Sequence, residues 1–170
     1  MLSKYLTKSP VVDPAAWVAP DARVIGDVTI GEHSSVWYQC VLRGDVSHIR
    51  IGKRSNIQDH STLHVSRDHG PTIVGDDVTV GHRAVVHGCE IGNRALIGIG
   101  AIVLDHAVIE PGAMVAAMSL VTSGTVVPAG MVVMGQPAKV VRAVSPEERA
   151  WMDETLEEYM TLAREHAGSA

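Results

Sequence analysis

The fold is decided by residues 74–136, which divide into short words: VGDDVT, VGHRAV, VHGCE, IGNRAL, IGIGAI, VLDHAV, IEPGAM, VAAMSL, VTSGTV, VPAGMV and VMGQ. Nearly all are six residues long, and each begins with Val or Ile. The fifth position is usually small, as at Ala84, Ala95 and Ala107. A period of six fits neither an amphipathic helix nor an alternating strand. It predicts an all-β solenoid of hexapeptide repeats, a parallel β-helix in which three words form one triangular coil.

The same rhythm starts at Val18, and two words interrupt it. LRGDVSHIR (42–50) is three residues too long, and LHVSRDHGPTI (63–73) is five too long. We expect each to be a normal word with a loop pushed out near a corner. The predicted division is an N-terminal cap or entry segment (1–17), the β-helix (18–142) and a C-terminal α-helix packing on it (143–170). Ser145 and Glu148 form a capping box at the start of that helix.

Composition excludes several classes of function. The 170 residues carry a formal net charge of −5 with dispersed Lys and Arg, so we expect no nucleic-acid binding. No apolar run is long enough to span a membrane, and the first residues lack the apolar core of a secretory signal. Two cysteines, Cys40 and Cys89, make no disulfide framework. We therefore expect a cytoplasmic protein without a membrane partner, and a small buried thiol at Cys89.

Counting three words per coil assigns each word to a face and stacks residues in columns. One face begins its words at Val36, Ile57, Val80 and Ile97, and the next at Leu42, Leu63, Val86 and Val103. The second position of the latter face reads Arg43, His64, His87 and then Leu104. The neighbouring face contributes Gln58 and a third-position column of Tyr38, Asp59, His82 and Ile99. Polar residues therefore gather over the same coils, and we expect Trp37 and Tyr38 to pack at a subunit interface.

Three of the histidines suggest a metal site. Three neutral imidazoles with an open fourth position are the ligands of catalytic zinc. His64 and His87 fall in one column at the spacing of adjacent strands, about 4.8 Å. His82 lies around a corner, so one chain does not bring it to the same metal. A homotrimer would, by setting His82 of one subunit beside His64 and His87 of the next.

At these residues the chain resembles the gamma-class carbonic anhydrase family. The matching pieces are Arg43-Gly44-Asp45, the run from Asn56 through Gln58-Asp59 to His64, and the segment from Gly81-His82 to His87-Gly88-Cys89. Gly135-Gln136-Pro137-Ala138 and the following helix also match. The loop between residues 66 and 72 is short, as in members named for ferripyochelin binding or for carnitine or phenylacetate metabolism.

The resemblance implies a left-handed β-helix and a trimer with a metal at each subunit interface. His64, His82 and His87 map to the metal ligands, and Arg43, Asp45, Gln58 and Asp59 map to the polar residues around the metal. The implied metal is Zn²⁺, with Fe²⁺ or Co²⁺ as alternatives. The implied reaction is reversible hydration of CO2 to bicarbonate by a hydroxide on the metal, with Gln58 orienting hydroxide or CO2. Arg43 would pair with Asp45 or Asp59.

Other readings remain open on sequence alone. The same metal site could hydrolyse a thioester such as an acyl-CoA, or the chain could be an inactive metal-binding scaffold. A hexapeptide acyltransferase is a further alternative, although that class usually lacks a three-histidine site. The short loop offers Asp68 and His69, and His69 is a candidate proton shuttle because an ordinary imidazole pKa is about 6.5.

Overall fold

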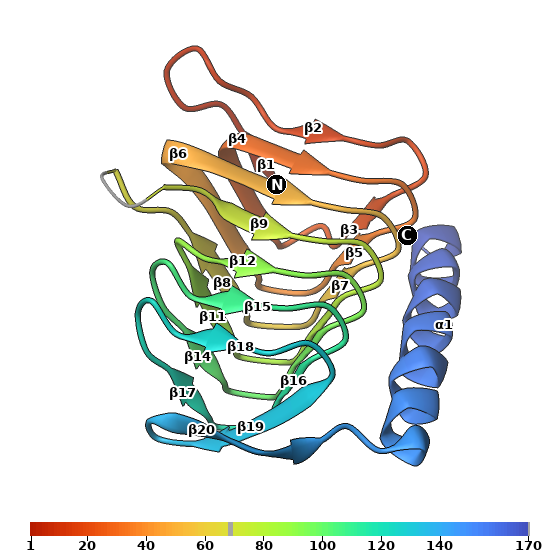
Figure 1. Ribbon diagram of the computed structural model, residues 1–170. Coiled ribbons are helices and arrows are strands. Elements are labelled where there is room, and N and C mark those ends of the chain that lie inside the picture. Colours follow the sequence, from red (N-terminus) through yellow and green to blue (C-terminus); the bar gives the residue numbers. More distant parts are fainter. Residues whose placement is uncertain (68–69, 170) are drawn as a thin grey trace.

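The computed structural model of the protein describes residues 1–67 and 70–169, and these form a parallel β-helix with one α-helix beside it (Figure 1). The early strands are β1 (Leu2–Ser3), β2 (Val11–Val12), β3 (Trp17–Val18), β4 (Arg23–Ile30), β5 (Ser35–Val36), β6 (Val41–Ile51), β7 (Asn56–Ile57), β8 (Thr62–His64), β9 (Thr72–Val74) and β10 (Thr79–Val80). The later strands are β11 (Val85–His87), β12 (Glu90–Ile91), β13 (Leu96–Ile97), β14 (Ile102–Val103), β15 (Val108–Ile109), β16 (Met114–Val115), β17 (Leu120–Val121), β18 (Val126–Val127), β19 (Met131–Gly135) and β20 (Ala138–Ala143). The helix is α1 (Pro146–Gly168).

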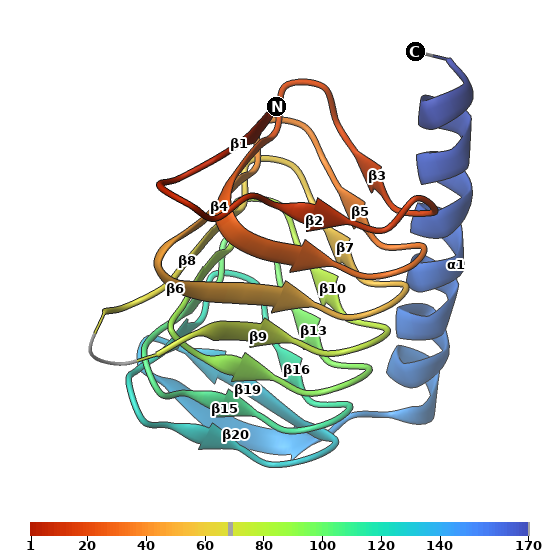
Figure 2. The same cartoon turned by 90° about the horizontal axis from the view of Figure 1, so that it is seen from above.

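The coils have three faces, which are stacked in chain order (Figure 2). The helix face is the sheet β3-β5-β7-β10-β13-β16-β19, to which β20 adds an antiparallel edge strand. The histidine face follows the order β6-β8-β11-β14-β17, and the third face follows β6-β9-β12-β15-β18. Strand β6 belongs to both of these faces because it continues around a corner.

The register confirms the columns that the six-residue period predicts. Leu42 pairs with Leu63, Leu63 with Val86, and Val86 with Val103, all in parallel ladders. All four side chains are fully buried, as are their counterparts Val36, Ile57, Val80 and Ile97 on the helix face. The small fifth-position residues Ala84, Ala95 and Ala107 are buried as well. The core is therefore a narrow interior filled by one aliphatic layer per word.

The two overlong words differ from each other. We expected a loop at residues 42–50, but β6 remains extended, and its register against β4 shifts between Gly26 and Val28. The extra residues are thus a bulge at the corner, which bends and twists a strand without ending it. The word at 63–73 does form a loop, because β8 ends at His64 and β9 begins at Thr72. Asp68 and His69, including the candidate proton shuttle, lie outside the described residues.

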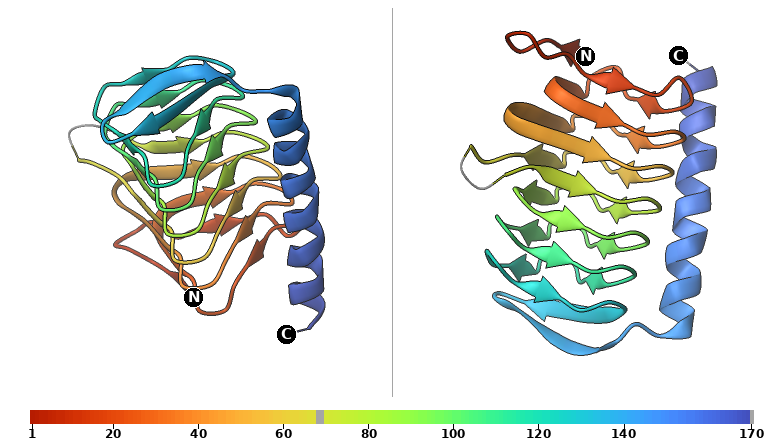
Figure 3. Two further views of the ribbon diagram at one scale, coloured as in Figure 1. Left: turned by 90° about the horizontal axis from the view of Figure 1, so that it is seen from below. Right: turned by 45° about the horizontal axis from the view of Figure 1, so that its top comes forward.

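The chain ends are attached to the solenoid. β1 and β2 pair in parallel with β4, so the segment 1–17 adds an irregular first coil. After β20, α1 runs back along the helix face, and both termini lie at the same end of the stack (Figure 3). Ser145 and Glu148 form the expected capping box, with Pro146 in the first turn. Within the described residues, no helix is long and apolar enough to cross a membrane.

Aromatic side chains fill the contact between α1 and the first coils. The Trp37 ring packs edge-on against Trp17, with centroids 4.9 Å apart, and against Tyr159 of α1 at 5.1 Å. Trp37 is only 5% exposed in the single chain. The expectation that Trp37 packs at a subunit interface is therefore wrong: the chain's own helix covers it.

Candidate metal centre

His64 and His87 meet on the histidine face, as the columns predict. Their strands place them in direct register, and the ring centroids are 5.0 Å apart. His64 Nδ1 lies 3.0 Å from His87 Nε2. Two nitrogen ligands of one tetrahedral zinc ion are separated by about 3.3 Å. The pair is therefore spaced close to what a shared metal ion requires.

Each of these imidazoles also contacts a carboxylate with its other nitrogen. His64 Nε2 lies 3.1 Å from Asp45 Oδ1, and His87 Nδ1 lies 2.8 Å from Asp105 Oδ1. Metal-binding histidines usually use their second ring nitrogen in this way, which fixes the tautomer and the ring orientation. Burial lowers the pKa of His64, more than its hydrogen bond to Asp45 raises it. The neutral form that binds metal is thus favoured.

A count of protons tests whether a cation fits between the two rings. The contacts Asp45–His64, His64–His87 and His87–Asp105 need three protons to be hydrogen bonds. Two neutral imidazoles supply only two, because each carries a single N–H. If both N–H groups donate to the carboxylates, two lone pairs face each other 3.0 Å apart. A metal cation satisfies both lone pairs, so the donor set fits a metal.

His82 lies at the corner between β10 and β11, away from this pair. Its Nδ1 is 2.9 Å from Asp59 Oδ2, and its Nε2 is 3.2 Å from the Tyr159 hydroxyl of α1. Across the described residues of one chain, no three His, Cys, Asp or Glu side chains converge in a way that could hold a metal ion. Sequence reasoning anticipated this separation of His82 within a single chain.

The polar residues around the histidines form two groups. Arg43 pairs with Asp45, which also contacts His64. Burial alone would raise the pKa of Asp45, but hydrogen bonds from the Val46 amide and from Arg43 outweigh burial and lower that pKa. Of the two acids expected to pair with Arg43, Asp45 does so and Asp59 binds His82 instead.

Gln58 belongs to the helix face and is 5% exposed. Its Nε2 donates to Asn56 Oδ1 at 3.1 Å, and Asn56 Nδ2 donates to Thr79 Oγ1 at 3.0 Å. This chain fixes which way the Gln58 amide points and leaves its carbonyl oxygen outside these bonds. The side chain also lines an apolar cavity with Gly81, Ile99 and Trp151.

Two residues of the site were missed by sequence reasoning. Asp105 lies one coil beyond His87. The sequence signal for it is that an acidic residue directly follows Leu104, the residue that continues the histidine column. Tyr159 lies within the predicted C-terminal helix (143–170), and nothing in the repeat indicates which strand residue its hydroxyl meets. Its pKa is raised by burial and by the negative charge of Asp59.

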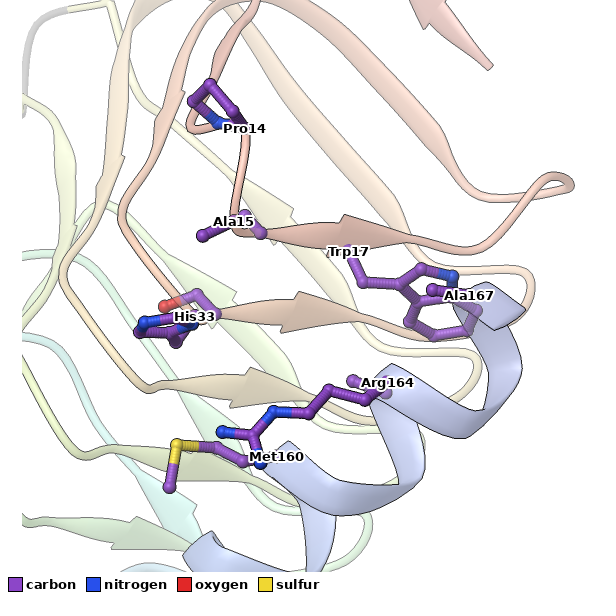
Figure 4. A pocket seen from close by; sticks show the side chains of 10 residues that line it. Pro14, Ala15, Trp17, His33, Met160, Arg164 and Ala167 are labelled. Atoms are coloured by element: carbon purple, nitrogen blue, oxygen red, sulfur yellow. The ribbon is translucent and has the colours of Figure 1, made fainter. Parts of the chain in front are cut away.

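A second cavity lies apart from the candidate metal ligands, between the first coils and the C-terminal part of α1 (Figure 4). Its walls include Trp17 and Met160, and Arg164 and His33 also line it. None of the candidate metal ligands contributes to this cavity. The chemistry of the histidine cluster is therefore separate from it.

Comparisons with solved structures define the class of the protein. A hexapeptide transferase family protein from Anaplasma phagocytophilum superposes with a TM-score of 0.92 at 45% identity, over 96% of both chains. A Bacillus cereus protein superposes with a TM-score of 0.97 at 40% identity, over 99% of this chain and 98% of that one. The protein is therefore a hexapeptide-repeat β-helix protein.

No family model matches the chain, but its sequence relatives identify a family within the hexapeptide-repeat class. Gamma carbonic anhydrase 2, mitochondrial, of Arabidopsis thaliana is 48% identical over 171 residues, which is 98% of this chain and 62% of the relative. The carbonic anhydrase of Geobacillus kaustophilus is 42% identical over 160 residues, covering 94% of this chain and 87% of the relative. The chain belongs to the gamma carbonic anhydrase family. It spans 62–66% of the length of the plant relatives.

Proposed function

We propose that the protein is a metal-dependent carbonic anhydrase of the cytoplasm, which hydrates CO2 reversibly to bicarbonate. His64 and His87 of one subunit and His82 of a neighbouring subunit would hold a Zn²⁺ ion, or Fe²⁺ or Co²⁺, at each interface of a homotrimer. When bound, the metal supplies hydroxide at neutral pH, because a coordinated water has a pKa of about 7.

One observation carries the proposal: each of the three histidines has one ring nitrogen on an aspartate from another word of the repeat. The pairs are His64 with Asp45, His82 with Asp59 and His87 with Asp105. A surface histidine without a ligand to bind has no need of such an arrangement, whereas a metal ligand uses it to fix its tautomer. Three such histidine–aspartate pairs on neighbouring coils support a shared role of the histidines as metal ligands.

Exposed apolar side chains support the homotrimer. Ile99 and Met118 occupy corners beyond His82 and are 53% and 64% exposed, and Ile102 on the histidine face is 37% exposed. Large apolar side chains that gather on one surface mark sites of protein association. A second subunit covering these side chains would also bring His82 to the pair of histidines on its neighbour.

The surrounding side chains would position the reactants. Arg43 holds the Asp45 carboxylate against His64 and keeps that imidazole in place. Gln58, whose amide is fixed by Asn56, would orient CO2 or hydroxide through its remaining hydrogen-bonding atoms. Asp59 keeps the proton of His82 on Nδ1.

The test is stopped-flow CO2 hydration with protein loaded with zinc, or with iron under anaerobic conditions, and with His87→Ala as the control. We expect hydration by the metal-loaded protein and none above background in the variant. Sedimentation of the same samples measures the oligomeric state, and a monomer would contradict the shared site. Equal metal content in the wild type and in His87→Ala would refute the ligand assignment.

A second candidate is hydrolysis of a thioester such as an acyl-CoA by the same site. The observation that favours it is the apolar cavity formed by Gln58, Gly81, Ile99 and Trp151, which could take a short acyl chain. A screen of acyl-CoA hydrolysis on the metal-loaded protein compares the two reactions. Activity in neither assay would favour a metal-binding scaffold. Acyl transfer that persists after metal removal would favour a hexapeptide acyltransferase.

A further inference from the structure

His82 is held at both of its ring nitrogens. Nδ1 lies 2.9 Å from Asp59 Oδ2, and Nε2 lies 3.2 Å from the hydroxyl of Tyr159. A carboxylate only accepts hydrogen bonds, so the imidazole proton sits on Nδ1. The lone pair on Nε2 must then accept the hydrogen bond that the Tyr159 hydroxyl donates.

This lone pair is also the one that a metal would need. A neutral imidazole has a single nitrogen lone pair available for bonding in the ring plane, and it cannot accept a proton and bind a cation at the same time. We propose that the Tyr159 hydroxyl is hydrogen-bonded to the metal-binding nitrogen of His82 and is displaced when the metal binds. Tyr159 is thus a positioning residue that competes with the metal for this nitrogen. This inference rests on the proposed function, because it takes His82 as a ligand.

The surroundings of Tyr159 suit an exchange of partners. Its ring is half-buried and packs edge-on against Trp37, 5.1 Å away, and the Trp37 indole donates to Ser35 Oγ at 2.9 Å. The ring is thus held by packing that does not depend on the hydroxyl. When the metal takes Nε2, the hydroxyl loses one acceptor while the ring stays where it is.

The chain contains a matched control for this contact. The Tyr38 hydroxyl lies 2.8 Å from His166 Nδ1, so a second tyrosine–histidine hydrogen bond joins the solenoid to the same helix. In that pair the tyrosine comes from the solenoid and the histidine from α1, and neither is a candidate metal ligand. Tyr38→Phe therefore removes an equivalent bond without touching His82.

The experiment compares Tyr159→Phe with Tyr38→Phe in the full chain. Co²⁺ and Zn²⁺ affinities are measured by competition with a chelator, and thermal melting is measured with and without metal. A neutral hydrogen bond contributes about 0.5–1.5 kcal/mol, which corresponds to roughly a 2- to 12-fold change in affinity. We expect Tyr159→Phe to bind both metals about 2- to 12-fold more tightly, and Tyr38→Phe to bind them as the wild type does.

Thermal melting tests the same exchange through the stability of the protein with and without metal. Without metal, both variants should melt about 1–6 °C below the wild type. With saturating metal, Tyr159→Phe should match the wild type, because the bond is already broken there, whereas Tyr38→Phe should stay lower. If both hydrogen bonds only anchored the helix, the two variants would melt at equally lowered temperatures with and without metal, and their metal affinities would be unchanged.

Unchanged or weaker metal binding by Tyr159→Phe, with a normal metal site in the wild type, overturns the exchange and leaves the proposed function standing. If the wild type binds no metal, or if His82→Ala binds it as tightly as the wild type, both proposals fail together. If metal binding behaves as expected but CO2 hydration is absent, the exchange stands and only the reaction is wrong.

Discussion

The two halves of the solenoid share a core but differ on the outside. Words between residues 36 and 90 and words between 91 and 133 bury the same kind of inward side chain, fully in both halves. In the first half the outward columns hold Arg43, His64, His87 and His82. In the second half the same columns continue with Leu104 and Ile99. Position in the repeat therefore determines burial, and only the outward residues determine chemistry.

Departures from the period coincide with the site. The overlong first word supplies Arg43 and Asp45, and Asp45, within the bulge of β6, contacts His64. The second overlong word starts with the strand that carries His64 and returns at Thr72, whose hydroxyl accepts from the Gly88 amide next to His87. The first half thus carries all three candidate ligands, and the second half contributes one supporting side chain, Asp105, which contacts His87.

The largest contrast should come from one column. His64→Ala should lower metal affinity by more than about 100-fold, because losing a ligand exceeds the 10- to 100-fold cost of losing an outer partner. Leu104→Ala, two coils along the same column, should leave metal affinity unchanged. Metal content after dialysis, measured by mass spectrometry, checks both. Metal retained by His64→Ala would remove the distinction between the halves.

Core substitutions should not distinguish the halves at all. Ile57→Ala and Ile97→Ala both truncate fully buried side chains on the helix face. Each should lower the free energy of unfolding by about 2–5 kcal/mol, from lost burial and the resulting cavity. Urea denaturation of the metal-free protein measures both. If only Ile97→Ala were costly, the equivalence of the two cores would be wrong.

The aspartates behind the histidines should have an intermediate effect. Asp105→Asn keeps the shape of the side chain but weakens the support of His87, and should cost 10- to 100-fold in metal affinity. Asp77→Asn is the matched control, since Asp77 pairs with Arg54 at 2.6 Å and contacts no candidate ligand. Chelator competition compares the two variants. Equal affinities would mean that Asp105 has no role at the site.

The start of α1 should respond to acid. Hydrogen bonding to Arg142, with help from the Ser145 amide, lowers the pKa of Glu148 from 4.5 to about 2. Because the folded pKa is lower, this carboxylate stabilises the helix above pH 4.5, and that stability is lost as pH falls toward 2. The pair is exposed, so the effect should be small. Trp151 fluorescence from pH 6 to pH 2 should show a step that Glu148→Gln lacks.

The smallest effect concerns the thiols. Burial raises the pKa of both Cys40 and Cys89 to about 12, so neither forms a thiolate near neutral pH. A disulfide reagent at pH 8 should therefore label neither cysteine in the native protein and both in urea. Rapid native labelling of Cys89 would contradict its place in the core, two residues beyond His87.

Much of the fold could be predicted from the sequence because the six-residue period determines the local orientation of each side chain. One aliphatic residue per word fixes which side chain points inward, and three words per coil then fix which residues stack. The sequence alone therefore predicts the pairing of His64 with His87, which the register confirms. The prediction is wrong at the first overlong word, since the choice between a loop and a bulge depends on how β4 accommodates the extra residues.

The missed residues have a different cause. Asp105 contacts His87 from the adjoining coil, and the six-residue period predicts which residues stack but not which outward side chains hydrogen-bond. Tyr159 depends on how α1 packs against the solenoid. The period of the strands does not set the rotation of a helix about its own axis. The site could be located from the repeat, but the contacts that orient its ligands could not.

The position of α1 has a consequence for how the protein unfolds. In an open array each repeat touches only its neighbours, so the ends can fray independently. Here Arg149 donates to the Gly112 carbonyl, Arg94 pairs with Asp153, and Tyr38 meets His166, so one helix bonds to late, middle and early coils. Separating a coil at either end therefore breaks contacts with an element anchored at the other. Because α1 contacts coils along the stack, the end coils cannot unfold independently, and their unfolding becomes cooperative.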